Sequence, residues 1–338
     1  WKTDSLETRR YNLVVGAWGS SDKSVVTARL SAMDIPVLKA IDEGWIVEAV
    51  LTPSELIQVI QWNEILGVDR KGDPEVDMDN VRSAMGGNYV ETVGGFTGNG
   101  VRAEAMDSGL DTSHPDWSGT RAPIWHGSSA VGSHGTCIFG IVFGDGSSTS
   151  SARGMMPNAQ GIMAYYGGWS NRYTHTQECV NSTLRCVFQT NSWGDPRTTQ
   201  YTSVSQEMDD IIFLTDFSIL QSQSNSGWQD SRPQAWAKNM ISVGGFYHYD
   251  DTSDGNDSWS GGASVGPAAD GRIKPDISAY YDATHCSDES GGAGYSSGDT
   301  YTSFGGTSGA TPIVAGHLGL FYEMWHAGIF GNATGTDV

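Results

Sequence analysis

The stretch Gly305-Gly306-Thr307-Ser308-Gly309-Ala310-Thr311-Pro312, near the C-terminal end, organises the rest of this sequence. Its two leading glycines allow a tight turn, and the small residues after Ser308 open a segment with a helical pattern. A hydroxyl in that position would lie at a helix N-terminus, where free N–H groups and the helix dipole favour a developing anion. The stretch therefore predicts either a nucleophilic serine or an ordinary helix cap, and the rest of the chain decides between them.

The charge and hydropathy of the chain argue against two classes of partner. Acidic residues outnumber basic residues 39 to 19, which gives the 338-residue chain a formal net charge of −20. We expect no nucleic-acid partner, because phosphate binding requires a basic surface. No run of apolar residues approaches the roughly 18 that cross a bilayer, so we expect no membrane partner either.

The first 75 residues alternate between strand and helix patterns. The expected elements are strands at 11–17, 45–51 and 65–68 and a helix at 21–33. A second helix begins at Thr52-Pro53-Ser54-Glu55, which places a proline in its first turn. This alternation predicts a small α+β domain at residues 1–75. The polar, acidic stretch 71–80 separates it from a second domain at 76–338.

From residue 101 onwards, apolar strand-like segments alternate with helical ones. The expected strands are 101–106, 161–166, 187–193, 218–224 and 240–244, and the expected helices are 135–143, 206–214 and 308–327. This alternation predicts a doubly wound parallel sheet covered on both faces, with active residues at the carboxyl ends of its strands. The chain after the last helix is short, small and polar, and we expect this domain to be truncated at its C-terminus.

Three further residues share the setting of Ser308, at a strand end or a helix start beside a glycine. Asp107 follows an expected strand, His134 begins an expected buried helix, and Asn225 ends another strand. Taken singly, each has an ordinary structural explanation, since Asp and Asn are common in turns. Together they supply a base, a carboxylate that orients it, a nucleophile and an amide that stabilises an oxyanion. Asp, His, Ser is also a known chain order of the catalytic triad.

The segments around these residues resemble the motifs of the subtilisin-like serine peptidases, or subtilases. The similar segments are Asp107-Ser108-Gly109, Gly132-Ser133-His134-Gly135-Thr136, Asn191-Ser192-Trp193-Gly194, Asn225-Ser226-Gly227, Asp270-Gly271-Arg272-Ile273-Lys274-Pro275-Asp276 and Gly306-Thr307-Ser308-Gly309-Ala310-Thr311-Pro312. They fall in the family's order, and the resemblance covers roughly residues 80 to 327. It implies a subtilisin-like α/β fold and a serine endopeptidase that acts on protein or peptide substrates through an acyl-enzyme.

The resemblance also implies a role for each residue of the site. Asp107, His134 and Ser308 are the expected catalytic triad, and Asn225 is the expected oxyanion donor. The expected substrate-binding residues, which border the specificity pocket, are Ser192, Trp193, Gly194 and Ser224.

The N-terminal domain resembles the subtilase propeptide, a ferredoxin-like folding chaperone and inhibitor. The resemblance implies that residues 1–75 act as an intramolecular inhibitor of the catalytic domain. The chain would then be a precursor-like form, or a form that retains this domain.

The sequence departs from the family pattern at several positions. Cys137 stands where the family usually has His, and Phe139 replaces a small residue. Ser224 stands where glycine is common, so the neighbouring pocket wall is expected to differ. Gly309 replaces the methionine that usually follows the nucleophile, so oxidation is expected to cost less activity here.

Calcium is the expected cofactor, because subtilases commonly hold structural calcium. The densest acidic loop is Asp250-Asp251-Thr252-Ser253-Asp254-Gly255-Asn256-Asp257, and its expected ligands are Asp250, Asp254, Asn256 and Asp257. A solvated acidic loop is the alternative, since no glutamate occupies the place it has in an EF-hand.

The four cysteines give information on the cellular location of the protein. Cys179 and Cys186 are close enough in sequence to close a short loop with a disulfide, while Cys137 and Cys286 have no assigned partner. A disulfide is typical of secreted or otherwise extracytoplasmic proteins, which is the expected location.

Two other functions remain open at this point. A sedolisin-type acid peptidase shares the Gly-Thr-Ser motif, but His134 and Asn225 argue against it. A latent, zymogen-like form that acts mainly as a binding protein is the non-enzymatic alternative.

Overall fold

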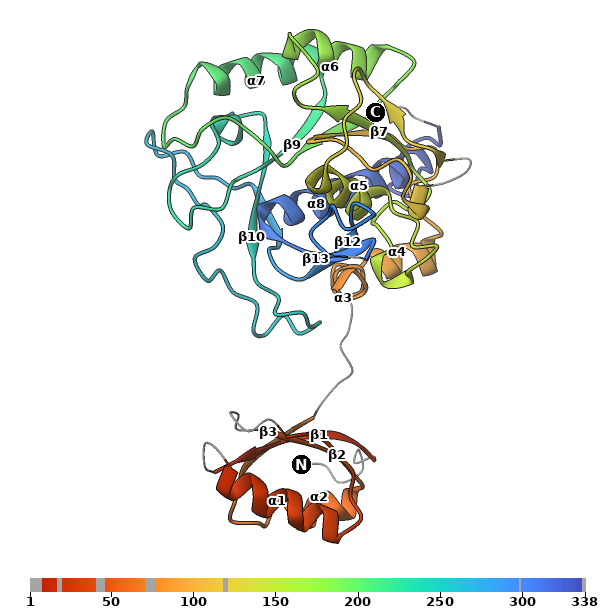
Figure 1. The fold of residues 1–338 in the computed structure, drawn as a ribbon. Helices are drawn as coiled ribbons and strands as arrows, with labels where there is room; N and C mark the ends of the chain where they lie inside the picture. Colours follow the sequence, from red (N-terminus) through yellow and green to blue (C-terminus); the bar gives the residue numbers. More distant parts are fainter. Residues whose placement is uncertain are drawn as a thin grey trace. The chain divides into compact units, whose positions relative to one another are not determined.

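The computed structural model describes residues 8–16, 20–40, 46–70, 77–117, 121–297 and 299–335. The chain divides into two compact units, Trp1–Glu75 and Val76–Val338 (Figure 1). Residues 71–76, which include the predicted domain boundary, lie outside the described residues. Each unit is therefore described by itself.

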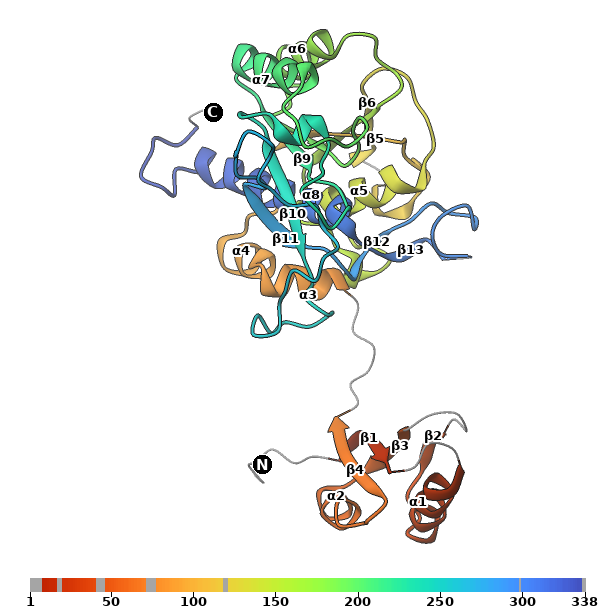
Figure 2. The ribbon, with the colours of Figure 1, turned by 90° about the vertical axis from the view of Figure 1, so that its left-hand side faces the viewer.

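The first unit is a small antiparallel sheet with two helices on one face (Figure 2). Its elements are β1 (Arg9–Val15), α1 (Ser20–Ala32), β2 (Val37–Ala40), β3 (Ile46–Leu51), α2 (Pro53–Val59) and β4 (Ile65–Arg70). The strand order is β2-β3-β1-β4, and every pairing between the described strands is antiparallel. This β-α-β-β-α-β arrangement is the ferredoxin-like fold that the sequence predicts.

Local sequence explains why these elements form. The Thr52 hydroxyl accepts the N–H of Glu55, and the Glu55 carboxylate accepts the N–H of Thr52, which makes a capping box at the start of α2. Alternate residues of the central strand β1, namely Tyr11, Leu13 and Val15, are fully buried. They form a core with Val26 and Leu30 of α1 and with residues of α2 and β3.

In the described part of the second unit, seven parallel strands form one sheet in the order β11-β10-β9-β8-β5-β7-β6. These strands are β5 (Arg102–Asp107), β6 (Ile124–Trp125), β7 (Gln160–Tyr165), β8 (Phe188–Asn191), β9 (Ser218–Ser222), β10 (Ile241–Phe246) and β11 (Ile277–Tyr280). A separate antiparallel pair consists of β12 (Thr284–Ser287) and β13 (Tyr301–Phe304). The predicted doubly wound, subtilisin-like α/β fold is confirmed.

Helices cover both faces of the large sheet (Figures 1 and 2). The helices α5 (Ser133–Phe143) and α8 (Gly306–His326) pack on one face, and α6 (Arg172–Asn181) and α7 (Ser203–Thr215) lie on the other. Two further helices, α3 (Asp77–Ala84) and α4 (Gly87–Gly94), precede the sheet. No helix in the described part of the chain is both long and apolar enough to span a membrane.

The period of two in a strand sends neighbouring side chains to different cores. On β7, Ile162 belongs to the core beneath α6 and α7, whereas Met163 belongs to the core beneath α5 and α8. On β5, Ala103 and Ala105 face α5 and α8. Glu104, which lies between them, is fully buried and therefore faces α6. This alternation decides which polar groups meet on each face.

Several elements were not predicted from the sequence. The strands β2, β6, β11, β12 and β13 have two to four residues each, too few to show an alternating pattern. Helix α6 has the mainly polar sequence RYTHTQECVN, which has no apolar stripe. The predicted strand 218–224 ends at Ser222, since Ser224 has a φ of 96° and leaves the extended conformation.

Candidate active site

The predicted catalytic residues lie where three elements of the second unit begin or end. Asp107 is the last residue of β5, His134 is in the first turn of α5, and Ser308 is in the first turn of α8. A Cβ placed on Gly135 would lie 2.1 Å from the carbonyl oxygen of Gly109. Only glycine therefore lets the start of α5 approach the turn after β5, which brings the histidine to the aspartate.

Asp107 and His134 form a direct hydrogen bond. His134 Nδ1 lies 2.7 Å from Asp107 Oδ1, and the Ser108 N–H donates to the same oxygen. Asp107 is fully buried, whereas the His134 side chain is 31% exposed. Donation from Nδ1 leaves His134 Nε2 as the nitrogen with a free lone pair, which is the form that acts as a base.

The pKa of His134 reflects two opposing effects. Burial lowers this pKa, but the charge of Asp107 and its hydrogen bond raise it, and the net result is a pKa above the ordinary value of 6.5. The Asp107 carboxylate thus stabilises the imidazolium that forms when the histidine accepts a proton.

Ser308 is held by an exchange of hydrogen bonds with Ser192. The Ser308 hydroxyl donates to the Ser192 carbonyl oxygen at 3.4 Å, and the Ser192 hydroxyl donates to the Ser308 carbonyl oxygen at 3.0 Å. Among the described residues, no hydrogen bond joins the Ser308 hydroxyl to His134. Catalytic hydrogen bonds are often long in the absence of substrate and tighten when it binds.

Asn225 lies beside the start of α8. Its Oδ1 accepts the N–H of Thr307 at 2.9 Å and the Thr307 hydroxyl at 3.1 Å. Its Nδ2 makes no hydrogen bond to the described residues, and the side chain is exposed. A Cβ on Gly306, where φ is 76°, would lie 3.2 Å from this nitrogen. Glycine thus keeps open the space next to the free amide donor.

The predicted substrate-binding residues divide into two groups. Ser192 and Ser224 both bond to the first turn of α8, since the Ser224 N–H donates to the Thr307 hydroxyl at 3.1 Å. Gly194 is packed closely, because a Cβ there would lie 2.9 Å from Gln234 Oε1.

Trp193 packs among aromatic side chains. Its ring packs against those of Tyr166 and Trp169, with ring centres 5.3 and 6.2 Å away. It also lines a cavity of about 100 Å³ that includes the side chains of Arg172 and Glu207.

Two positions that depart from the family pattern have different surroundings. Cys137 is fully buried, its Sγ lies 3.9 Å from Asp288 Oδ1, and burial raises the pKa of its thiol well above the ordinary value. A Cβ on Gly309 would meet Thr284 Oγ1 at 3.5 Å as its nearest neighbour, an ordinary contact distance. The immediate surroundings therefore do not impose glycine after the nucleophile.

The predicted disulfide between Cys179 and Cys186 is not formed in the structure. Both residues, like Cys137 and Cys286, are free, buried thiols. Cys186 donates its backbone N–H to the carbonyl oxygen of Cys179 at 2.9 Å, and both side chains belong to the core beneath α6 and α7. A buried thiol packs as a small apolar side chain, so this loop is closed by packing and a backbone hydrogen bond.

Some polar groups of the predicted calcium loop already have protein partners, since the Asn80 amide donates to Asp250 Oδ1 at 3.0 Å. The Asn256 amide donates to Asp251 at 2.9 Å. Among the described His, Cys, Asp and Glu side chains, Asp250, Asp254 and Asp257 do not form a group close enough to share a metal ion. These three carboxylates therefore do not converge on one point, and calcium at this loop stays a prediction.

One group of chemically competent residues was missed from the sequence. Glu104, His126 and His175 meet on the face of the sheet opposite to Asp107. The signal was the glutamate itself, a charged residue between the two alanines of a strand.

Comparison with known proteins identifies the family of this chain. The model of the subtilase family matches residues 98–329. Among solved structures, the prenylagaramide maturation protease PagA is 17% identical with a TM-score of 0.56, and the match covers 72% of this chain and 82% of that one. The epidermin leader peptide processing serine protease EpiP from Staphylococcus aureus is 14% identical with a TM-score of 0.51, over 95% of this chain and 89% of that one. The self-cleaved protease domain of PatA is 18% identical with a TM-score of 0.54, over 70% and 84%. At these identities the structural matches show a common fold, and the family match covers most of the chain. The chain therefore belongs to the subtilase family and is a serine-type peptidase.

Proposed function

We propose that this serine endopeptidase uses Asp107, His134 and Ser308 as its catalytic triad. The observation that carries the assignment is the 2.7 Å hydrogen bond from His134 Nδ1 to the buried Asp107. It supports a histidine whose Nε2 faces away from the carboxylate and accepts a proton. Ser308, in the first turn of α8, is the hydroxyl that the sequence motifs pair with it.

The reaction proceeds in two stages. Ser308 Oγ attacks the peptide carbonyl carbon while His134 Nε2 takes its proton, and Asp107 stabilises the resulting cation. The C–N bond then breaks, and His134 returns the proton to the leaving amine. A water molecule attacks the acyl-enzyme ester with His134 again as base, which releases the acid product and restores the Ser308 hydroxyl.

We assign the oxyanion site to the Asn225 side-chain amide and the backbone N–H of Ser308. Asn225 is oriented by Thr307, which engages its Oδ1 and leaves Nδ2 available. The Ser308 N–H belongs to the first turn of α8, where backbone donors have no partner within the helix. One such donor typically contributes a factor of about 10²–10³ in kcat.

Labelling with a serine-directed fluorophosphonate tests the triad. Ser308→Ala should abolish labelling and casein hydrolysis while leaving the circular dichroism spectrum and Tm unchanged. Ser303→Ala is the matched control, because Ser303 is exposed on β13. Normal hydrolysis by Ser308→Ala would refute the assignment.

We also propose that residues 1–75 act as an intramolecular inhibitor, so that the chain is a zymogen-like form. What supports this is a ferredoxin-like unit with its own core, placed before the catalytic unit and similar to the subtilase propeptide. The labelling rate should rise when residues 1–75 are removed and fall when they are added back as a separate chain. Equal rates in all three samples would contradict the proposal.

A location outside the cytoplasm stays a prediction. The four free thiols remove the disulfide on which it partly rested. Its remaining support is the propeptide-like unit, and its test is fractionation of cells that express the native gene.

A further inference from the structure

A second constellation of polar side chains lies on the other face of the large sheet. Glu104 on β5, His126 just after β6 and His175 on α6 come from three separate segments. One ligand atom from each lies within 4.8 Å of those of the other two. It is the one such group found among the described residues, and the triad does not use it.

The two histidines present nitrogens to the same carboxylate. His126 Nδ1 lies 2.5 Å from Glu104 Oε2, and His175 Nε2 lies 2.8 Å from Glu104 Oε1. The imidazole rings are stacked, with ring centres 3.9 Å apart and planes inclined by 22°. Glu104 is fully buried, and the two histidine side chains are 6–8% exposed.

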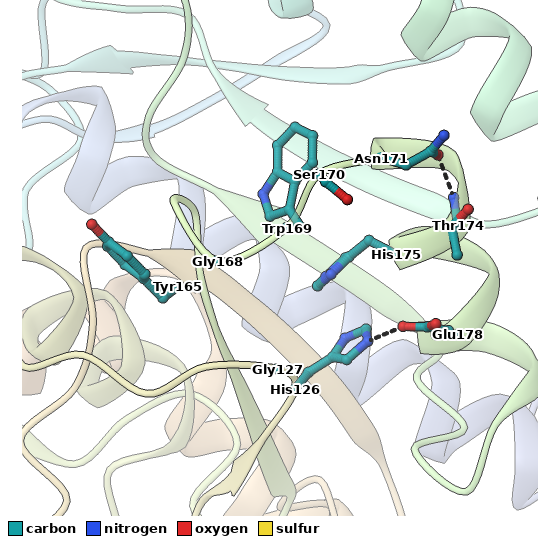
Figure 3. A pocket seen from close by; sticks show the side chains of 10 residues that line it. All are labelled: His126, Gly127, Tyr165, Gly168, Trp169, Ser170, Asn171, Thr174, His175 and Glu178. Carbon is teal, nitrogen blue, oxygen red and sulfur yellow. Dashed lines mark hydrogen bonds and ion pairs between the residues drawn. The ribbon is translucent and has the colours of Figure 1, made fainter.

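Further groups hold these three side chains in position. Glu178 Oε2 lies 3.2 Å from His126 Nε2, the nitrogen that faces away from Glu104 (Figure 3). Gln189 donates its amide to Glu104 Oε1, and Arg172 in turn donates to Gln189. Arg172 thus bonds to the amide, and the carboxylate is left facing the two histidines. A ligand histidine commonly donates its second nitrogen to a carboxylate in this way.

The cluster is accessible from solvent. His126, His175 and Glu178 line a cavity of about 320 Å³, and Figure 3 shows their side chains pointing into it. Exposed residues, Gly168 and Ser170, also line this cavity. It is wide enough for an ion to enter and for water to remain beside it.

The arrangement suits a divalent cation, because one carboxylate and two imidazoles offer it convergent ligand atoms. A buried carboxylate needs positive charge nearby, because burial of an uncompensated charge is costly. A divalent cation supplies the charge with both histidines neutral.

We propose that Glu104, His126 Nδ1 and His175 Nε2 bind one zinc ion, with water from the cavity as the fourth ligand. Two histidines and a glutamate with one open position form a known zinc ligand set. Bonds of about 2.0–2.1 Å in a tetrahedral site place ligand atoms roughly 3.3 Å apart. The observed separations, 2.5 Å from His126 Nδ1 to Oε2 and 2.8 Å from His175 Nε2 to Oε1, are shorter than this. To admit the ion, the nitrogens must move back by roughly half an ångström or more, and Glu104 must turn one of its two oxygens towards the ion. Glu178 then accepts the N–H of His126 and fixes its orientation.

The decisive experiment measures zinc content and affinity, which do not depend on the triad. The full chain with Ser308→Ala, which prevents self-digestion, is treated with chelator, desalted and titrated with ZnCl2 against a chromophoric zinc indicator. We expect one equivalent of tightly bound zinc, confirmed by elemental analysis after dialysis. The Tm should rise with zinc concentration, because the ion would join three segments of the fold.

Variants tie the binding to these residues. His126→Ala and His175→Gln should each lose the tight equivalent, whereas His285→Gln, a half-buried histidine on β12, should keep it. Glu178→Gln should weaken binding by roughly 10–100-fold, the usual effect of removing a carboxylate that orients a ligand histidine. Because Glu178 is 58% exposed, this variant decides the matter if the histidine variants fail to fold. No bound zinc in the folded chain, or equal affinity in His126→Ala and His285→Gln, would overturn the proposal. If the histidine variants fail to fold, a zinc affinity of Glu178→Gln equal to that of the chain with Glu178 intact would also overturn the proposal.

Discussion

Asp107 and Glu104 lie three residues apart on strand β5, and each binds histidine on a different face of the sheet. Asp107 meets His134 on the face covered by α5 and α8. Glu104 meets His126 and His175 on the face covered by α6. The period of two along a strand separates these two carboxylate–histidine units, so one strand supports both the reaction centre and the proposed metal site.

Asn225→Asp tests the oxyanion assignment with little change in shape. The aspartate keeps an oxygen that accepts from Thr307 but removes the amide donor and adds a negative charge beside the developing anion. We expect kcat to fall by about 10²–10³ or more, with a small change in KM. Steady-state kinetics on a peptide anilide, with Tm as the check on folding, measure this. An unchanged kcat would remove Asn225 from the mechanism.

The pH dependence of kcat/KM reports the protonation of His134. The base must be neutral to accept the Ser308 proton, and Asp107 raises the pKa of His134 above 6.5. Activity should therefore be lost as the pH falls through a midpoint above 6.5. Asp107→Asn removes the charge that raises this pKa, so the midpoint should move to lower pH while the maximal rate falls steeply. A midpoint well below neutral in the unmodified protein would instead favour an acid peptidase.

The same shift predicts a small effect of His134 on stability. A pKa raised by folding means that the protonated histidine stabilises the folded state below the unfolded pKa. That contribution is lost as the pH rises through the higher, folded value. In urea titrations, Ser308→Ala should therefore lose some stability above neutral pH, and Ser308→Ala combined with His134→Gln should lack this component.

Gly309→Met tests the oxidation resistance expected from the sequence. The nearest neighbour of a Cβ at this position is 3.5 Å away, so the fold should accept a side chain there. The variant should lose most of its activity in hydrogen peroxide, whereas the unmodified chain should retain most of it. The chain's other methionines are common to both proteins and serve as the internal control. Equal inactivation would place the sensitive group elsewhere.

Adding back single metals separates the predicted calcium loop from the proposed zinc site. EGTA binds zinc as well as calcium, so the chain is first treated with EGTA and desalted. If the loop 250–257 binds calcium, CaCl2 should then raise the Tm both with and without ZnCl2. Asp254→Asn should remove the calcium effect and leave zinc binding unchanged. No effect of CaCl2 on the Tm of the EGTA-treated chain would identify the loop as a solvated acidic segment.

Leu30→Ala tests the role of the first unit through its stability. Leu30 is fully buried in the core of that unit, so the substitution should cost it about 2–5 kcal/mol. If this unit inhibits the peptidase, the variant should label with fluorophosphonate faster than the unmodified chain. Leu38→Ala, at a half-exposed position, is the control and should label at the unmodified rate. If both variants labelled at the rate of the unmodified chain, this would argue against inhibition by a folded N-terminal unit.

Much of the architecture could be read from the sequence, because it depends on local patterns. Apolar runs predicted the long strands β5, β7 and β9, and the buried run after His134 predicted α5. Thr52-Pro53-Ser54-Glu55 marked the start of α2, where the structure forms a capping box within four residues. The short strands and the polar helix α6 carry no such pattern, so only the tertiary structure identified them.

The sequence by itself determined the identity of the candidate catalytic residues. Asp107, His134, Asn225 and Ser308 stand in glycine-containing motifs, because a side chain at a strand end or a helix start needs a tight turn or a close approach beside it.

Only the tertiary structure decided what Glu104 contacts and how Cys179 and Cys186 pack. Glu104, His126 and His175 are up to 71 residues apart and share no motif. They meet because β6 and β7 pair beyond β5, and α6 crosses the face to which Glu104 points. The spacing of residues within a motif can be read from the sequence, whereas contacts between residues on different strands and helices form only when the chain folds.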